Sequence, residues 1–438
     1  MTLRKTLSGL AVAATLIAAP ALAQDAPAAA APAVDNAFIF NTLLFLIGGF
    51  LVFWMAAGFA MLEAGLVRSK NVTMQLTKNI ALFSIAAIMY WLVGYNLMYP
   101  GDGWSVAGWL GAFSLADIQG DPALEAGYAT GSDFFFQLMF CATTASIVSG
   151  ALAERIKLWP FLIFTTILTG LVYPIEASWQ WGGGWLSEMG FSDFAGSTLV
   201  HAVGGFAALA GALILGPRIG KFTKDGRVNP IPGSNLALAT LGTFVLWLGW
   251  FGFNGASQLA LGTEADANAV AIIFANTNMA AAAGAVMAMI LTQLVYKKVD
   301  LTMVLNGALA GLVSITAGPL DPSLFGALWI GAVGGVIVVF TVPLLDKLKI
   351  DDVVGAIPVH LVAGFWGTLA VPFYTDGTSF LTQIIGFAAI GAFVLVVSAV
   401  VWIVLKATMG LRPSAEDEIN GLDRSELGME AYPEFSNG

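Results

Sequence analysis

The hydrophobic pattern of this chain consists of long apolar runs separated by short polar loops. From about residue 38 to 407, eleven segments are apolar and long enough to cross a bilayer, allowing for tilt and glycine breaks. Such runs satisfy their backbone hydrogen bonds in lipid only as helices, which predicts an all-α integral membrane protein with eleven transmembrane helices. The segments cover approximately residues 39–65, 72–98, 133–153, 158–176, 195–216, 234–256, 267–296, 302–319, 323–345, 353–374 and 379–406.

The basic residues test this number of segments independently. Beyond the N-terminal region they fall in six clusters; one predicted span precedes the first cluster, and two separate each cluster from the next. All six clusters therefore lie on one side of the membrane, which the positive-inside rule identifies as cytoplasmic. We expect the mature N-terminus outside and the C-terminus in the cytoplasm. The clusters are Arg68/Lys70/Lys78, Arg155/Lys157, Arg218/Lys221/Lys224/Arg227, Lys297/Lys298, Lys347/Lys349 and Lys406/Arg412/Arg424.

The first residues have the pattern of a secretory signal. Arg4 and Lys5 precede a short apolar run, and the sequence Ala-Leu-Ala that ends at Ala23 matches a signal peptidase site. We expect residues 1–23 to be a cleaved signal peptide, the alternative being an uncleaved first span. Residues 24–37 then form an Ala/Pro linker, residues 38–408 the transmembrane domain and residues 409–438 a cytoplasmic tail.

Composition agrees with this class. The 438 residues are 58% hydrophobic and 11% charged, whereas about a quarter of the residues of a soluble domain are charged. Most of the net charge of -10 comes from the loops expected outside and from the tail, and such an acidic face attracts cations only weakly at physiological salt. The single cysteine, Cys141, excludes an internal disulfide.

The two histidines of the chain lie in a repeated phrase. Residues 193–206 (DFAGSTLVHAVGGF) and 352–365 (DVVGAIPVHLVAGF) share Asp, Gly, Val, His, Val, Gly and Phe at equal offsets. The copies fall five spans apart, an odd number, so the first enters the membrane from outside and the second from the cytoplasm. This predicts an inverted five-helix repeat plus an eleventh helix. Inverted repeats are typical of transporters whose substrate path lies at the repeat interface.

His201 and His360 are the first candidates for function. A midspan imidazole is unfavourable in lipid, so both should face the interior or an aqueous lumen, and the repeat should bring them together. Such a pair either ligates haem or another metal, or lines a narrow pore in which the ring nitrogens pass on a small polar molecule or a proton. The chain lacks a CxxCH motif and any further histidine, which favours the pore. Asp193 and Asp352 are interpreted as helix caps.

Aromatic and small residues supply further candidates for a path. Phe136 and Phe140 lie one helical turn apart in DFFFQLMF, and Trp181 adjoins three glycines in SWQWGGGWL. Phe253 and Ser257 are four residues apart in LWLGWFGFNGAS. Each has a structural alternative, because aromatic residues are common at membrane interfaces and in helix packing.

Six segments occur in order between about residue 38 and the end of the chain: SIVSGALAERIKLWPF, DFAGSTLVHAVGGFAALAGALILGPR, LGWFGFNGAS, GALAGLVSIT, DDVVGAIPVHLVAGFWGTLAV and GLDRSELGMEAYPEF. Together they resemble the ammonium transporter (Amt) family, relatives of the Rhesus proteins. The resemblance implies a homotrimer in the bilayer of the bacterial inner (plasma) membrane, with a separate pore in each protomer. It implies a transporter and not an enzyme, with no cofactor, no metal and no nucleic acid.

The resemblance also implies roles for the aromatic residues near the outer surface. Trp181, Phe140 and Ser257 resemble the family's outer ammonium-recruitment site, with Phe136 beside it. Phe140 and Phe253 resemble the stacked pair that closes the pore entrance.

The same comparison implies roles deeper in the chain. His201 and His360 resemble the twin histidines of the lumen, and Asp193 resembles a structural acid near the outer site. Ring faces attract ammonium, a serine oxygen accepts a hydrogen bond that potassium has no proton to donate, and an apolar lumen excludes an unpaired ion. We therefore expect ammonium to be bound and deprotonated outside, and ammonia to pass the histidines, with or without a separate proton.

Two alternatives belong to other classes of protein. A membrane redox protein would use both histidines as ligands of a haem or metal. An ammonium sensor would signal through its cytoplasmic tail and transport little. For the tail itself, the alternatives are a disordered end or, as the resemblance implies, a segment that packs under the trimer near the docking position of a PII-type nitrogen regulatory protein.

Overall fold

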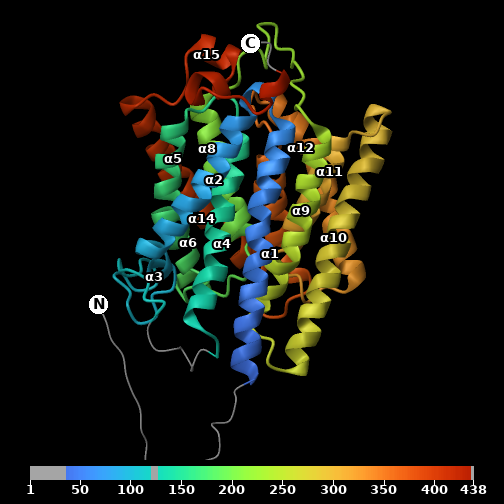
Figure 1. Cartoon of the computed structure of the whole chain (residues 1–438). Coiled ribbons are helices and arrows are strands. Elements are labelled where there is room, and N and C mark those ends of the chain that lie inside the picture. Colours follow the sequence, from blue (N-terminus) through green and yellow to red (C-terminus); the bar gives the residue numbers. More distant parts are fainter. Residues whose placement is uncertain (1–35, 120–126, 436–438) are drawn as a thin grey trace, which may run out of the picture. The chain divides into compact units, whose positions relative to one another are not determined.

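Helices form almost all of the regular structure. The computed structural model describes residues 36–119 and 127–435, so the predicted signal peptide lies outside the described residues, as does all of the predicted linker except its last two residues. Within these ranges the chain is all-helical, with two isolated β-bridges and no strand. The long helices run alongside one another as a bundle (Figure 1). The prediction of an all-α protein is confirmed.

Nine of the eleven predicted spans coincide with helices that are long and apolar enough to cross a membrane. Some of these spans continue through a π-helical or 3₁₀ turn into a second helical segment. Two such spans carry two labels each in Figure 1, one α2 and α3, the other α5 and α6. The α-helices of the described residues are α1 (Asn36–Leu66), α2 (Val72–Met89), α3 (Tyr95–Met98), α4 (Thr130–Ala151), α5 (Leu158–Ile167), α6 (Tyr173–Ser178), α7 (Trp185–Glu188), α8 (Val203–Leu215), α9 (Leu236–Gly255), α10 (Glu264–Tyr296), α11 (Leu301–Ile315), α12 (Leu324–Lys347), α13 (Ala363–Ala370), α14 (Phe380–Thr408) and α15 (Ala415–Asn420).

The other two predicted spans are shorter than expected. The segment predicted at 302–319 is helical over Leu301–Ile315, and the one predicted at 353–374 over Ile357–Phe373. A helix of 15 residues is about 22 Å long, less than the roughly 30 Å of a hydrocarbon core. Irregular backbone at membrane depth is tolerated only inside protein, and α11 is buried throughout its second half.

The two histidine segments fold in the same way. In each, an aspartate accepts backbone hydrogen bonds, and the glycine three residues later has a positive φ, 105° at Gly196 and 81° at Gly355. A six-residue π-helical turn that contains the histidine follows in both. The matching backbone supports the internal repeat. The two turns are Ser197–Ala202, which continues into α8, and Ile357–Val362, which continues into α13.

Glycines allow the helices to approach closely. A Cβ on Gly242 of α9 would lie 2.3 Å from the backbone nitrogen of Leu62 on α1. A Cβ on Gly284 of α10 would lie 2.2 Å from the carbonyl oxygen of Gly307 on α11. Backbone contact through small residues is a common way for membrane helices to associate.

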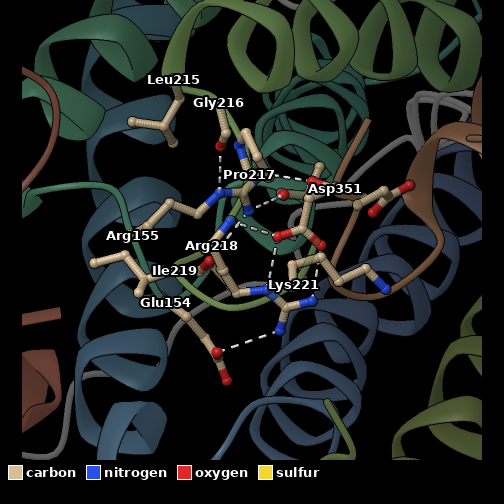
Figure 2. A network of polar contacts seen from close by, with 12 residues as sticks. Glu154, Arg155, Leu215, Gly216, Pro217, Arg218, Ile219, Lys221 and Asp351 are labelled. Carbon is tan, nitrogen blue, oxygen red and sulfur yellow. Dashed lines mark hydrogen bonds and ion pairs between the residues drawn. The ribbon is translucent and has the colours of Figure 1, made fainter. Parts of the chain in front are cut away.

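Loops that carry three of the basic clusters meet in a network of ion pairs. Figure 2 shows the part of this network around Arg155, Arg218 and Asp351. Arg218 Nε lies 2.8 Å from Asp351 Oδ2, and Arg218 Nη1 lies 3.2 Å from Glu154 Oε2. Arg68 Nη2 lies 2.6 Å from the same Glu154 oxygen, while Arg155 donates to the Asp351 carbonyl. Burial acts to raise the pKa of Asp351, but bonding to Arg218 and the charge of Arg155 outweigh it and hold the pKa below its usual value. The contacts support one common face for these clusters.

The tail packs on this same face. Asp423 accepts hydrogen bonds from the backbone nitrogens of Thr73 and Met74, at 2.9 and 2.7 Å. Glu418 pairs with Arg412 at 2.7 Å. In Figure 1, α15 lies at one end of the bundle. As far as residue 435, the alternative of a disordered end is therefore wrong.

Candidate functional site

A cavity of about 350 Å³ brings together three of the four residues predicted for the outer ammonium-recruitment site, and it is called the outer cavity after that prediction. Phe140, Trp181 and Ser257 line it. Phe136 does not line it but packs behind Phe140, with ring centroids 4.8 Å apart. The remaining lining residues were not predicted from the sequence: Tyr95, Tyr99, Tyr128, Asp133, Gln137, Phe194 and Leu259.

Local contacts fix the side chains of this cavity. Trp181 follows α6, and its Nε1 donates to the backbone oxygen of Asp193 at 2.9 Å, which holds the indole at the cavity wall. Phe140 meets it edge-on, with ring centroids 6.0 Å apart. Ser257 Oγ donates to the carbonyl of Phe253 at 2.8 Å. Because the hydroxyl hydrogen of Ser257 is engaged in this bond, the oxygen is free to accept a hydrogen bond from a ligand.

Two stacked phenyl rings separate the cavity from the interior. Phe140 on α4 and Phe253 on α9 have ring centroids 4.1 Å apart at an interplanar angle of 30°, and both are buried. Phe253 also stacks on the imidazole of His201, with centroids 5.2 Å apart. The rings thus form a continuous series from Trp181 to the first histidine.

The histidines lie directly against each other. His201 Nδ1 and His360 Nδ1 are 3.2 Å apart, and both side chains are buried. One Nδ1 must carry a hydrogen and the other must accept it, so the two rings hold opposite tautomers. His201 Nε2 has no protein partner within the described residues, which leaves it able to bond a small polar molecule. When a proton moves from one Nδ1 to the other, the histidine that donated the hydrogen bond becomes the one that accepts it.

Trp250 supports the first imidazole. Its ring stacks on His201 with centroids 4.9 Å apart, and its Nε1 donates to Thr316 Oγ1 at 2.8 Å. The Thr316 hydroxyl in turn donates to the carbonyl of Leu312. This chain of contacts fixes the plane of the His201 ring.

Asp193 does not line the cavity. Its two carboxylate oxygens accept hydrogen bonds of 2.8 to 3.0 Å from four consecutive backbone nitrogens, from Gly196 to Leu199. Burial raises the pKa of Asp193 above its usual value, although these four donors favour the charged form. Asp352 accepts in the same way from Gly355 and Ile357. This geometry fits the capping interpretation of both residues.

The geometry of the histidine pair does not fit axial ligation of a haem or metal with one ring on each side of it. Nitrogens on opposite sides of a metal lie about 4 Å apart, since each bond is about 2.0 to 2.1 Å long. The observed 3.2 Å is a hydrogen-bond distance, and the rings are stacked at 25°. The described part of the chain also contains no cluster of three or more His, Cys, Asp or Glu side chains suited to a metal.

The polar wall of the outer cavity was missed in the sequence. Tyr95 donates to Asp133 Oδ2 at 2.5 Å, and Gln137 donates to the other oxygen of the same carboxyl at 3.3 Å. Burial raises the pKa of Tyr128, in the loop before α4, to about 12, so its hydroxyl stays protonated. Asp133 lies three residues before Phe136, so helical spacing from that aromatic residue would have found it. The tyrosines come from distant segments and leave no such signal.

Comparison with known proteins decides the family. A family model described as the Ammonium Transporter Family matches residues 43–432. This chain belongs to that family. Two curated relatives are the ammonium transporter Amt2 of Archaeoglobus fulgidus, 41% identical over 420 residues (89% of this chain, 87% of the relative), and the ammonium transporter of Bacillus subtilis, 35% identical over 419 residues (91% and 98%).

Solved structures agree with this membership. A protein titled Sensor Amt Protein has a TM-score of 0.83 and 35% identity, covering 89% of this chain and 98% of its own. Mep2 of Candida albicans has a TM-score of 0.79 and 28% identity, covering 91% and 92%. The resemblance found in the sequence is therefore confirmed, and this member of the ammonium transporter family is a multi-pass membrane protein.

Proposed function

We propose that the protein carries ammonium nitrogen across the bacterial inner membrane, by binding ammonium in the outer cavity and conducting ammonia past the two histidines. The observation that carries this proposal is the unbroken series from cavity to histidines. Trp181, Phe140 and Phe253 follow one another at ring distances of 6.0 and 4.1 Å, and His201 follows Phe253 at 5.2 Å. A path of this kind suits a small ligand that loses its charge on the way.

The outer cavity selects for ammonium through its chemistry. The indole of Trp181 and the ring of Phe140 attract a cation by about 0.5 to 2 kcal/mol each. Ser257 Oγ accepts a hydrogen bond from ammonium, whereas potassium has no proton to donate. The carboxyl of Asp133 on the same wall adds negative charge or a further acceptor.

The buried rings and histidines select for the neutral form. An unpaired cation beside Phe140 and Phe253 would lose its hydration without compensation, which is unfavourable by several kcal/mol or more. Ammonia carries no such penalty. In this mechanism ammonium releases a proton at the cavity, and ammonia then bonds His201 Nε2 through its lone pair or its N–H groups. The Nδ1 contact between the histidines offers a separate route for the proton.

We further propose the arrangement in the membrane. The N-terminus of the mature chain, after removal of residues 1–23 and past a linker to residue 37, lies outside, and the tail from residue 409 lies in the cytoplasm. The halves are inverted repeats, because Asp193 lies beside the outer cavity while Asp352 lines a pocket with Arg218 near the basic clusters. The protein assembles as a homotrimer, and its cytoplasmic face docks a PII-type regulator. No covalent chemistry is proposed.

A sensor is the second candidate, because one structural neighbour is titled Sensor Amt Protein. Transport and sensing are separated by adding ammonium to proteoliposomes that hold the purified protein. A transporter produces a saturable ammonium current or a rise in internal pH. Neither signal is expected from a sensor that transports little, and failure to see either in reconstituted, correctly folded protein would overturn the transport proposal.

A further inference from the structure

A buried glutamate lies on the side of the histidines away from the outer cavity. Glu63 is on α1, within a segment long enough to span the membrane, and is 1% exposed. An ionisable residue at such a position is unfavourable unless it is paired, and it commonly marks a functional site. Neither the outer cavity nor the stacked rings involve this residue.

The two oxygens of Glu63 have very different surroundings. Oε2 accepts hydrogen bonds from Gln75, from Asn79 at 2.7 Å and from Ser149 at 3.0 Å. Oε1 is buried and has no hydrogen-bond partner in the described chain. A buried carboxylate oxygen without a donor is costly by about 1 to 3 kcal/mol or more, so a ligand that donates a hydrogen bond would be strongly favoured there.

A basic residue stands near the other side of this group. Lys78 on α2 is 1% exposed, donates to the carbonyl of Ser149 at 3.0 Å and lies 4.7 Å over the ring of Phe161. Ser149 thus contacts both Lys78, through its carbonyl, and Glu63, through its hydroxyl. The lysine compensates the charge of the glutamate while leaving Oε1 unbonded.

The same glutamate and His360 line one small cavity. Its volume of about 10 Å³ is close to the space that one water molecule needs, and ammonia and ammonium are of similar size. Ser146 and Asn306 add polar groups to an otherwise apolar lining. Through Asn306 and the backbone at Val354 the cavity adjoins a pocket of about 400 Å³ that Arg218 also lines, at the face of the basic clusters.

We propose that Glu63 Oε1 forms an inner binding site for ammonium, where ammonia that has passed His360 is protonated again. This inference rests on the proposed transport function. The cavity holds one small molecule, the free oxygen accepts an N–H bond, and the adjoining pocket provides the exit.

The proton step at this site is balanced. The lone pair of ammonia takes the proton of the Glu63 carboxylic acid, so an N–H bond forms, the O–H bond breaks, and a carboxylate binds the new ammonium. The proton released at the outer cavity, carried along His201 and His360, restores the acid after ammonium leaves. Each cycle therefore moves one ammonia and one proton.

Infrared difference spectroscopy tests the site without relying on transport. Purified protein in lipid is exposed to ammonium chloride, and then to sodium chloride as the control, while carboxyl absorption is recorded. We expect the ammonium-dependent carboxyl signal of the wild type to contain a component from Glu63, in addition to any from Asp133 in the outer cavity, and this Glu63 signal is lost in Glu63→Gln. Glu188→Gln removes an exposed glutamate of α7 and should keep it. If Glu63→Gln does not fold, Ser146→Val fills the cavity while leaving the glutamate, and should also abolish the Glu63 signal.

Proteoliposome currents complete the experiment. We expect the ammonium current of Glu63→Gln to fall by roughly 10²-fold, the lower end of what a positioned proton donor contributes. An ammonium-dependent carboxyl signal that is identical to the wild type's in folded Glu63→Gln, or in Ser146→Val if the first variant does not fold, would overturn the inner site. A wild type that transports but gives no signal would overturn it too, while leaving the transport function intact. A Glu63-dependent signal without any wild-type flux would retain the site and refute transport.

Discussion

The Nδ1 atoms of His201 and His360 face each other at 3.2 Å, although 159 residues separate them in the chain. Each histidine follows an aspartate and a glycine of positive φ and lies in a π-helical turn. The contact thus arises from two copies of one local structure. In the proposed mechanism this contact provides a buried pair that can exchange a proton, and it sets the main expectation for the variants below.

Removing the stacked phenyl ring should reduce selectivity. Phe253→Ala deletes a ring that stacks on both Phe140 and His201, and such pairs are worth about 0.5 to 1.5 kcal/mol each. We expect the ratio of ammonium to potassium current in proteoliposomes to fall by up to about tenfold. Phe251→Ala is the matched control, because Phe251 is on the same helix but stacks on Phe274. Equal selectivity in Phe253→Ala and the wild type would contradict a role for the stack.

Loss of the outer indole should weaken ammonium binding. Trp181→Leu keeps an apolar side chain but removes a cation–π contact of about 0.5 to 2 kcal/mol, which corresponds to a roughly 2- to 30-fold rise in the half-saturating ammonium concentration. Concentration series of the current measure this value. Trp185→Leu should leave it unchanged, because Trp185 stacks on Trp109 and lines no part of the cavity. A similar rise in both variants would point to general damage of the loop.

The ion-pair network should make stability depend on acid pH. The pKa of Asp351 is lowered in the folded protein, so its stabilising contribution is complete above the ordinary pKa, about 4, and is lost as pH falls through the lower folded value. Asp351→Asn removes this titration. We expect its unfolding temperature to be lower at pH 7, by the equivalent of about 3 to 5 kcal/mol, and to change less between pH 5 and 3 than the wild type.

A more exposed ion pair provides the control for the stability loss expected in Asp351→Asn. Asp346→Asn breaks the contact of Asp346 with Lys221, which is 3.0 Å long and partly exposed. Such pairs contribute about 0.2 to 1 kcal/mol. An acid dependence that is the same in Asp351→Asn and in the wild type would show that another group is responsible.

The packed tail should be required for full transport. Deleting Glu416 to Gly438 removes the Asp423 contacts with Thr73 and Met74 and the Glu418 contact with Arg412. We expect ammonium flux per protein to fall several-fold, and Asp423→Asn alone to reproduce part of the loss. Glu416→Gln changes an exposed tail carboxylate and should transport normally. Full flux in the deletion would contradict coupling between tail and pore.

The sequence predicted those features that leave a periodic or repeated signal. The long apolar runs predicted nine of the spans, and the repeat of residues 193–206 at 352–365 predicted the pairing of His201 with His360. Helical spacing correctly grouped Phe136 with Phe140. These signals are local, so each can be found without knowing how distant segments pack.

The site residues that the sequence did not predict are brought together by contacts between distant segments. Tyr95 and Asp133 bond each other in the wall of the outer cavity, and Glu63 accepts hydrogen bonds from residues on α2 and α4. No spacing in the chain indicates these meetings.

The early end of α11 did have a local signal that the prediction overlooked, because Gly318 and Pro319 follow and proline disfavours a continuing helix. The carbonyls of Thr316 and Ala317 instead accept hydrogen bonds from the backbone nitrogens of Ala195 and Phe194.

Replacing both histidines tests the proposed transport path most directly. Purified wild type and the double variant His201→Ala/His360→Ala are reconstituted at equal density, and current and internal pH are recorded after an ammonium pulse, with a potassium pulse as control. We expect a saturable, ammonium-selective signal in the wild type and a loss of roughly 10²-fold or more in the folded double variant. A double variant that retains both ammonium flux and its associated charge movement would contradict transport through the histidine pair.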